Sequence, residues 1–169
     1  MSKLQFGRLT VDNDQDLVVL LIGARINRWW LLPLSVPILA KMNVMVRELL
    51  ADPSSGLLGV QPLGLFSSVQ YWRSYEHLHR YAHDKQKTHR PTWTQYFAKV
   101  FKNSAIGIWH ETYMLSGGRY ESIYVNMPSH GLGRFMPLIP AHGSKQSSSG
   151  RLAAQPTHTQ TEAEPAAVY

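Results

Sequence analysis

The chain has no cysteine, and this absence excludes disulfide bonds, thiolate zinc sites, cysteine nucleophiles and iron–sulfur clusters. It also lacks the glycine-rich patterns that cradle nucleotide phosphates, so a nucleotide cofactor is not expected. No long apolar run follows the first residues. The longest apolar stretch, residues 29–40, contains two prolines and is too short to span a bilayer. We therefore expect a cytoplasmic protein without a membrane span.

Acidic side chains are the scarcer charge: 11 Asp and Glu stand against 17 Lys and Arg, which gives a net charge of +6. Such an excess favours an anionic partner. The basic residues between positions 75 and 103, however, have the spacing of a solvated helical face. No RNA-binding motif, zinc finger or basic helix accompanies them. We therefore expect no nucleic-acid partner.

Composition divides the 169 residues into three parts. Residues 1–15 are polar and predict an N-terminal surface segment. Residues 16–135 carry the apolar runs and are sufficient for one globular domain. Residues 136–169 are predicted to be a disordered low-complexity tail. From position 143 onward Ser, Gln, Thr, Pro, Ala and Glu dominate, and such a composition cannot bury enough apolar surface to offset its ordering entropy.

The apolar residues of the domain predict alternating strands and helices. Residues 17–26 are apolar at both parities, which is typical of a strand covered on both faces. A helix follows, because Ile38, Met42, Met45 and Leu49 repeat at helical spacing. The other expected elements are strands at 56–66 and 68–73, helices at 74–83 and from 91 onward, and a β-hairpin of 106–113 and 120–127 around a turn at 116–118.

This β-α-β-β-α-β order predicts an α+β protein with the ferredoxin-like fold, extended by a C-terminal hairpin. Helices on one face of a four-stranded antiparallel sheet leave its other face bare, yet residues 17–26 are apolar toward both sides. Two sheets packed face to face would cover them. We therefore expect a homodimer in the form of a dimeric α+β barrel.

The predicted hairpin carries more polar and aromatic side chains than packing alone requires, which makes it the candidate site. The side chains concerned are Trp109, His110, Glu111 and Tyr113 on its first strand and Tyr124 and Asn126 on its second. Because neighbours on a strand point to opposite faces, His110 and Glu111 cannot both enter one pocket. Tyr124 and Asn126 are two residues apart and are expected to share a face.

Several segments also resemble a known family. They are residues 21–28 (LIGARINR), 47–53 (RELLADP), 69–74 (VQYWRS), 107–113 (GIWHETY) and 124–128 (YVNMP). The chain resembles, over about residues 7–134, the monooxygenase-like family typified by the fumagillin-pathway polyketide-cleaving oxygenase, which is similar to the antibiotic-biosynthesis monooxygenases. The resemblance implies a small dimeric α+β barrel that oxidises a hydrophobic conjugated molecule, polyketide or aromatic, with oxygen and no cofactor in secondary metabolism.

Such chemistry needs a base that deprotonates an acidic phenol or enol, and donors that hold the resulting anion in an apolar pocket. On this interpretation His110 or Glu111 is the base and Asn126 donates to the anion. The other expected substrate contacts are the donors Arg25 and Asn27 and the planar side chains Trp72, Trp109, Tyr113 and Tyr124.

Each of these residues also has a structural interpretation. His110 can be a hydrogen-bonded structural histidine, Glu111 can pair with an arginine across the sheet, and the tryptophans can belong to the core. Arg25 and Asn27 stand at the end of the first predicted strand, where polar residues commonly mark the emergence of the chain into solvent.

Two helical histidines, His79 and His83, are four residues apart, a spacing that can chelate a metal. No carboxylate motif accompanies them, so no metal site is expected. Haem is the alternative cofactor, with His79, His83 or His110 as its axial ligand. The alternatives to a monooxygenase are therefore a barrel that binds haem or another lipophilic ligand, and a non-oxidative dehydratase or cyclase.

Overall fold

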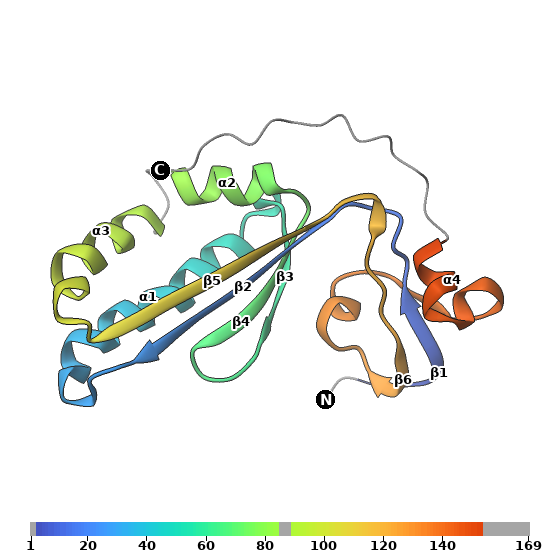
Figure 1. Ribbon diagram of the computed structural model, residues 1–169, viewed down its shortest axis with the longest axis horizontal. Helices are drawn as coiled ribbons and strands as arrows, with labels where there is room; N and C mark the ends of the chain where they lie inside the picture. The colour runs from blue at the N-terminus through green and yellow to red at the C-terminus, as the bar shows by residue number, and fades with distance from the viewer. Residues whose placement is uncertain (1–2, 85–88, 154–169) are drawn as a thin grey trace.

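Two antiparallel sheets organise the protein in a computed structural model that describes residues 3–84 and 89–153 (Figure 1). The main sheet contains β2 (Leu17–Ile26), β3 (Leu57–Pro62), β4 (Ser67–Trp72) and β5 (Ile106–Leu115), in the order β3-β4-β2-β5. Its helices are α1 (Leu32–Leu50), α2 (Tyr75–His83) and α3 (His89–Lys99). All neighbouring strands are antiparallel, and the predicted α+β ferredoxin-like fold is confirmed.

The first two helices begin where the sequence offers helix-starting residues. Pro33 lies in the first turn of α1, where a backbone N–H would have no helical partner in any case. The side-chain oxygen of Ser74 accepts a hydrogen bond from the His77 amide and caps α2. Glu76 lies in the first turn of α2, near the positive end of the helix dipole. The helix predicted from residue 74 is therefore present with its expected cap.

The helices are held on one face of the main sheet by two buried apolar clusters. One contains Val18, Leu20, Leu49 and Trp72, and the other contains Ala24, Ile38, Leu39, Tyr96, Val100, Ala105 and Ile106. Their members come from β2, β4, β5, α1, α3 and the turn after α3. Removal of these side chains from water fixes the helices to the sheet.

A second sheet has the order β6-β1-β7 and is built from β1 (Leu4–Val11), β6 (Tyr124–Pro128) and β7 (Leu138–Pro140). It corrects two predictions. The N-terminal residues lie largely at the surface but are not outside the fold, because β1 is the central strand of this sheet and buries Thr10 and Val11. The predicted hairpin is also wrong, since β5 pairs with β2 and β6 pairs with β1.

The chain leaves the main sheet at the turn after β5, where Gly117 and Gly118 both have positive φ, a conformation that glycine adopts without strain. The Asn13 amide donates to the Gly118 and Tyr120 carbonyls at 3.2 and 2.7 Å, and Asp16 accepts from the Gly117 amide at 2.7 Å. These contacts hold the segment after the turn against the N-terminal segment instead of against β5.

The second sheet covers part of the face of the main sheet that the helices leave open. Leu17 of β2 is 2% exposed and packs there with Val11 and Leu132, and Val19 borders the same cluster. The two-sided burial in the first half of β2 therefore arises within one chain. This corrects the reason for which a dimer was expected.

Residues 136–153 also depart from the predicted disordered tail, since they contain β7 and α4 (Ser148–Ala153). Arg151 ties this segment to the domain. Its Nε donates to Glu121 Oε2 at 2.6 Å, its Nη1 donates to the Lys145 and Gln146 carbonyls, and its own carbonyl accepts from Asn13 at 3.0 Å. Composition did not predict this order, because it depends on a few apolar contacts of Met136, Leu138 and Ala141 and on the polar contacts of Arg151. Residues 154–169 lie outside the described residues.

The helical segment Trp29–Leu50, a 3₁₀ turn (Trp29–Leu31) followed by α1, is long and apolar enough to cross a membrane by length and composition alone. The apolar stretch of residues 29–40 therefore gives too short a length for this helical segment. In the fold, α1 lies over the main sheet and buries Ile38, Leu39 and Leu49. A mostly buried core helix passes the same test of length and composition, whereas only 17% of the apolar window of this segment is buried in the fold.

Replacing Arg151 with alanine should destabilise the protein by about 1–3 kcal/mol, because Glu121 loses its ion-pair partner and two carbonyls lose a donor. Chemical denaturation followed by circular dichroism measures this change. Leu152→Ala is the matched control on the same helix: Leu152 is exposed, so the variant should stay within about 0.5 kcal/mol of the wild type. Wild-type stability of Arg151→Ala would contradict the role given to this arginine.

Candidate functional site

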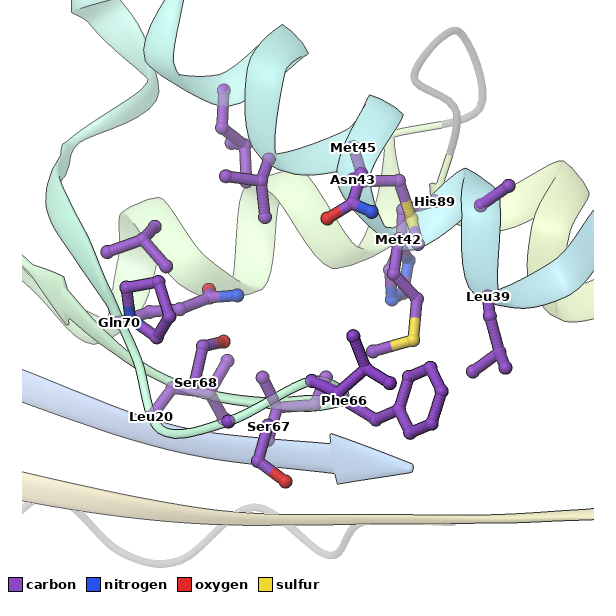
Figure 2. Close-up of a pocket in the computed structure, with 18 of the residues that line it drawn as sticks. Leu20, Leu39, Met42, Asn43, Met45, Phe66, Ser67, Ser68, Gln70 and His89 are labelled. Carbon is purple, nitrogen blue, oxygen red and sulfur yellow. The ribbon is translucent and has the colours of Figure 1, made fainter. Parts of the chain in front are cut away.

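A cavity of about 500 Å³ lies between the helices and the face of the main sheet that they cover (Figure 2). In Figure 2, Leu39 and Met42 reach from α1 toward the strands that carry Leu20 and Ser68. Other lining residues include Asn43, Met45 and Leu49 of α1, Gln70 and Trp72 of β4, Leu78, Tyr81 and Ala82 of α2, and His89 of α3. None of the described lining residues is acidic. The cavity therefore suits a lipophilic molecule with few hydrogen-bonding groups.

β4 supplies polar groups to the floor of the cavity. Gln70 and Trp72 are two residues apart, so both point toward the helices. The Trp72 indole N–H donates to Gln70 Oε1 at 3.1 Å, and both side chains are buried. This bond orients the amide of Gln70. Its Nε2 can then donate to a ligand in the cavity.

Tyr81 of α2 contributes a hydroxyl group. Its oxygen is buried and has no hydrogen-bond partner among residues 3–84 and 89–153. Burial raises the pKa of Tyr81 far above its usual range, and the charge of Glu48 adds to the rise. The hydroxyl therefore stays protonated near neutral pH. A buried donor without a partner is costly, and a ligand oxygen in the cavity would satisfy it.

His89, at the start of α3, brings an imidazole to the cavity. A carbonyl can only accept, so the Nδ1 that lies 3.1 Å from the Ala82 oxygen carries the hydrogen. An indole N–H can only donate, so Nε2, 2.7 Å from Trp93 Nε1, is the acceptor. Burial is the main cause that lowers the pKa of His89. The hydrogen bond to the Ala82 carbonyl raises this pKa in part, and the charges of His83 and His110 lower it further. The ring is therefore held neutral.

Of the side chains predicted to form the site, Trp72 alone lines this cavity. β5 places His110 toward the helix side, opposite Ile22, and places Glu111 and Tyr113 toward the other side, as strand alternation predicts. All four predicted side chains on β5, Trp109 included, are exposed. The Tyr113 hydroxyl donates to Glu111 Oε2 at 2.6 Å, and this bond raises the pKa of the tyrosine.

Trp109 lies on the face of the main sheet that the helices leave open. A Cβ added to Gly23 would sit 2.6 Å from the indole nitrogen, so the glycine makes room for the ring. Arg25 and Asn27 are exposed at the end of β2. Asn27 lies beside Gly107, where an added Cβ would be 3.3 Å from its Nδ2. None of the three predicted contacts reaches the cavity.

Tyr124 and Asn126 belong to β6 of the second sheet. The Tyr124 oxygen accepts from the Gly133 amide at 2.9 Å, and Asn126 Oδ1 accepts from the Gly7 amide at 2.9 Å. Asn126 has a φ of 47° and lies opposite a register shift in β1, so the alternation expected to place it beside Tyr124 is interrupted. Within one chain, His110 and Asn126 lie in different sheets and do not form one site.

The helical histidines belong to no group of side chains that could hold a metal ion in the described part of the chain. His79 and His83 stack with ring centroids 4.1 Å apart, and His83 Nδ1 bonds to the His79 carbonyl. Among the described residues, no three His, Asp or Glu side chains gather as a metal ion would require. A haem iron in the cavity would have to displace the Trp93 indole from His89 Nε2, because both nitrogens of this ring are engaged.

Sequence reasoning missed Tyr81, Gln70 and His89. A signal was available for the tyrosine, because Leu78, Tyr81 and Ala82 recur at helical spacing and so share one face of α2. Gln70 stands two residues before Trp72 on a predicted strand and shares its face in the same way. The state of His89 depends on contacts that join α2 to α3, and no spacing along the chain predicts them.

In comparisons with known proteins, the matched part of the chain includes the main sheet, its helices and β6. A family model described as monooxygenase af470-like matches residues 17–132. The monooxygenase af470 of Aspergillus fumigatus (strain ATCC MYA-4609 / CBS 101355 / FGSC A1100 / Af293) is 38% identical over 64 residues, which are 38% of this chain and 22% of that protein. The match thus spans about a fifth of the length of that relative.

The lowered pKa of His89 predicts a loss of stability in acid. Because the folded state favours the neutral ring, its contribution is complete above the pKa of an unfolded histidine, about 6.5, and falls as the pH drops below that value. His89→Gln should remove this part of the pH dependence. Denaturant unfolding between about pH 5 and pH 8 measures it.

His130→Gln is the control, since His130 is exposed in the loop after β6 and the slope should persist without it. An identical acid slope in His89→Gln and in the wild type would contradict the neutral, buried state of His89.

Proposed function

Because the chain belongs to the monooxygenase af470-like family, we propose that it is a monooxygenase-type oxidoreductase whose substrate binds in the cavity between the helices and the main sheet. We propose further that the substrate is a hydrophobic conjugated molecule of secondary metabolism, polyketide or aromatic, and that the reaction needs no cofactor. The observation that carries the proposal is the buried hydroxyl of Tyr81, a residue that lines the mostly apolar cavity, since this hydroxyl has no partner among the described residues.

The cavity has the volume and lining that such a substrate needs. About 500 Å³ falls in the range of small-molecule sites. The Tyr81 hydroxyl and the Gln70 amide can both donate to one phenol or enol oxygen, while Met42 and Met45 contact the ring. Negative charge on that oxygen strengthens both hydrogen bonds. The two donors therefore favour the substrate anion over the neutral substrate and lower its pKa.

In the proposed reaction the substrate supplies the electrons. Loss of a proton makes the conjugated system electron-rich, and it reduces molecular oxygen while a carbon–oxygen bond forms at the activated carbon. The oxygen–oxygen bond then breaks. One CH₂ group becomes a carbonyl, and its two hydrogens leave with the second oxygen atom as water. The apolar walls of the cavity exclude bulk water while the anion exists.

His89 Nε2 is the proton acceptor that the cavity lining offers, since the ring is neutral and this nitrogen carries the lone pair. A substrate hydroxyl would have to displace the Trp93 indole from it. His110 remains the alternative base, because Ile22, its cross-strand neighbour, lines the cavity. Glu111 lies on the far face of the same strand and is the less suitable base.

The engagement of His89 Nε2 by Trp93 favours one alternative, a protein that binds a lipophilic compound without transforming it. Oxygen uptake with a bound phenolic probe separates the two functions: uptake supports the oxygenase, and binding without uptake supports the alternative. An absorption spectrum of the purified protein tests the cofactor. A haem or flavin band would contradict a cofactor-free reaction.

Tyr81→Phe should lower oxygen uptake with naphthol as the phenolic probe by roughly 10²-fold, because the anion loses one of its donors. Its melting temperature should not fall, since the hydroxyl has no partner among the described residues. Tyr75→Phe is the matched control, because Tyr75 is exposed at the start of the same helix. Wild-type uptake by Tyr81→Phe would remove the hydroxyl from the proposed site.

We also propose a homodimer. β5 is an edge strand of the main sheet, and its residues 109–114 are exposed on both faces. Trp109, Tyr113 and Met114 are the large apolar or aromatic side chains among them. An edge strand with unpaired backbone groups and apolar side chains is a surface that another strand or sheet can cover.

Tyr113→Glu should convert the dimer to a monomer, because the substitution places a second negative charge beside Glu111 in an interface expected to bury ~2,000 Å² or more. Light scattering at micromolar concentration measures the mass. Leu152→Arg, a change at an exposed apolar side chain of α4, is the control and should leave the mass unchanged. A monomeric wild type would contradict the proposed dimer.

A further inference from the structure

One end of the molecule exposes aromatic and aliphatic side chains that the fold does not bury. The aromatic tip is defined as Trp29, Trp30, Leu32, Val36, Phe97 and Phe101. Trp29 is 73% exposed and Phe101 is 57% exposed. Trp29 contacts Trp30 edge to face, with centroids 5.9 Å apart, and Phe97 lies 5.2 Å from Phe101. Exposed apolar patches of this kind mark an interaction surface.

Segments far apart in the sequence meet to form the aromatic tip. Figure 1 shows the end of β2, the start of α1, the end of α3 and the start of β5 at the same end of the molecule. The backbone amides of Asn27 and Arg28 both donate to the Ala105 carbonyl, at 2.9 and 3.4 Å. These bonds join the chain just before Trp29 to the segment that follows Phe101.

Charge around the aromatic tip has a single sign. Arg25 and Arg28 are exposed at the end of β2, and Lys99 and Lys102 are exposed at the end of α3. The stretches of chain that build this end are residues 24–44, 62–66 and 93–109, and they contain no Asp or Glu. A surface that combines aromatic rings with cations and has no acid is complementary to an anionic interface.

The cavity opens beside the aromatic tip. Three exposed side chains also line the cavity: Leu32 and Val36 of the tip, and Leu65 in the turn between β3 and β4. Leu65 is 86% exposed. The Ala24 amide donates to the Phe66 carbonyl at 2.9 Å, which holds this turn against the end of β2. The mouth of the cavity is therefore apolar and adjoins the tip.

We propose that the aromatic tip docks on the surface of an anionic lipid bilayer. The tryptophan and phenylalanine rings enter the headgroup region, where amphipathic aromatic rings are stable, and the surrounding cations contact the anionic headgroups. α1 stays in the fold, because Ile38, Leu39 and Leu49 hold it against the main sheet. Docking is therefore peripheral and does not span the bilayer.

Docking in this orientation faces the mouth of the cavity toward the bilayer. A hydrophobic substrate dissolved in the membrane then reaches the cavity without crossing water. This second statement rests on the proposed function, whereas docking itself rests on the surface of the protein alone.

Vesicle flotation of the full chain tests docking. The protein should float with vesicles of phosphatidylcholine that contain phosphatidylserine. With vesicles of phosphatidylcholine alone, or at high salt, binding should be roughly tenfold weaker, because charge attraction is removed or screened. Equal binding to both kinds of vesicle, or no binding to either, would overturn the proposal. Resistance to alkaline carbonate extraction would overturn peripheral docking in favour of a spanning helix.

Two double variants test the surface. Trp29→Ala with Trp30→Ala, and Arg28→Glu with Lys102→Glu, should each bind anionic vesicles roughly tenfold less tightly. Their melting temperatures should not change, since all four side chains are exposed. Phe6→Ala is the matched control: Phe6 is 79% exposed on β1 of the second sheet, and the variant should bind as the wild type does.

Light scattering without lipid and oxygen uptake with naphthol in solution complete the test. If the tryptophan variant turns a dimer into a monomer, the aromatic tip is a protein interface and the docking proposal fails. If it loses vesicle binding but oxidises dissolved naphthol at the wild-type rate, docking is supported separately from catalysis. A wild type that binds vesicles and shows no uptake supports docking and contradicts the proposed function.

Discussion

The rest of the fold depends on burying both faces of β2. Its side chains are apolar at both parities, and a single layer of helices can bury only half of them. α1 and α3 cover the half that includes Leu20 and Ala24. Leu17 and Val19 point the other way and pack under the second sheet, which β1, β6 and β7 build from the two ends of the described chain. The same strand thus joins two sheets that share no backbone pairing.

Helices held on one face of the sheet also create the cavity, because they do not fill the space above β2 and β4. Packing alone would be best served by apolar side chains there, since an unpaired buried polar group is costly. Gln70 and Tyr81 instead bring an amide and a hydroxyl to an apolar space, and the bond from Trp72 fixes the amide in place. A ligand oxygen at this point would give the unpaired Tyr81 hydroxyl a hydrogen-bond partner and could also accept from the Gln70 amide.

Local sequence patterns predicted the features that depend on neighbouring residues alone, such as single strands and the starts of helices. Both parities of residues 17–26 identified β2, and Ser74 identified the start of α2. Such patterns could not predict the second sheet. Gly7 and Asn126, which form a hydrogen bond across it, are 119 positions apart, and neither residue type indicates which residue it pairs with. For the same reason the sequence did not predict that Asn126 Oδ1 accepts from the Gly7 amide of the second sheet. The cavity exists because side chains do not fill all the space between the helices and the main sheet, and the spacing of residues along the chain does not predict this.

Because β1 pairs with β6 and β7, the protein cannot complete its fold until residue 140 has been synthesised. The main sheet needs only residues 17–115, so it can assemble earlier, while β1 waits unpaired and the face around Leu17 stays open to water. Closing a loop of more than a hundred residues makes this the late and slow step of folding. In that interval the nascent chain exposes a strand edge and an apolar face together. It is then most open to aggregation and to capture by chaperones.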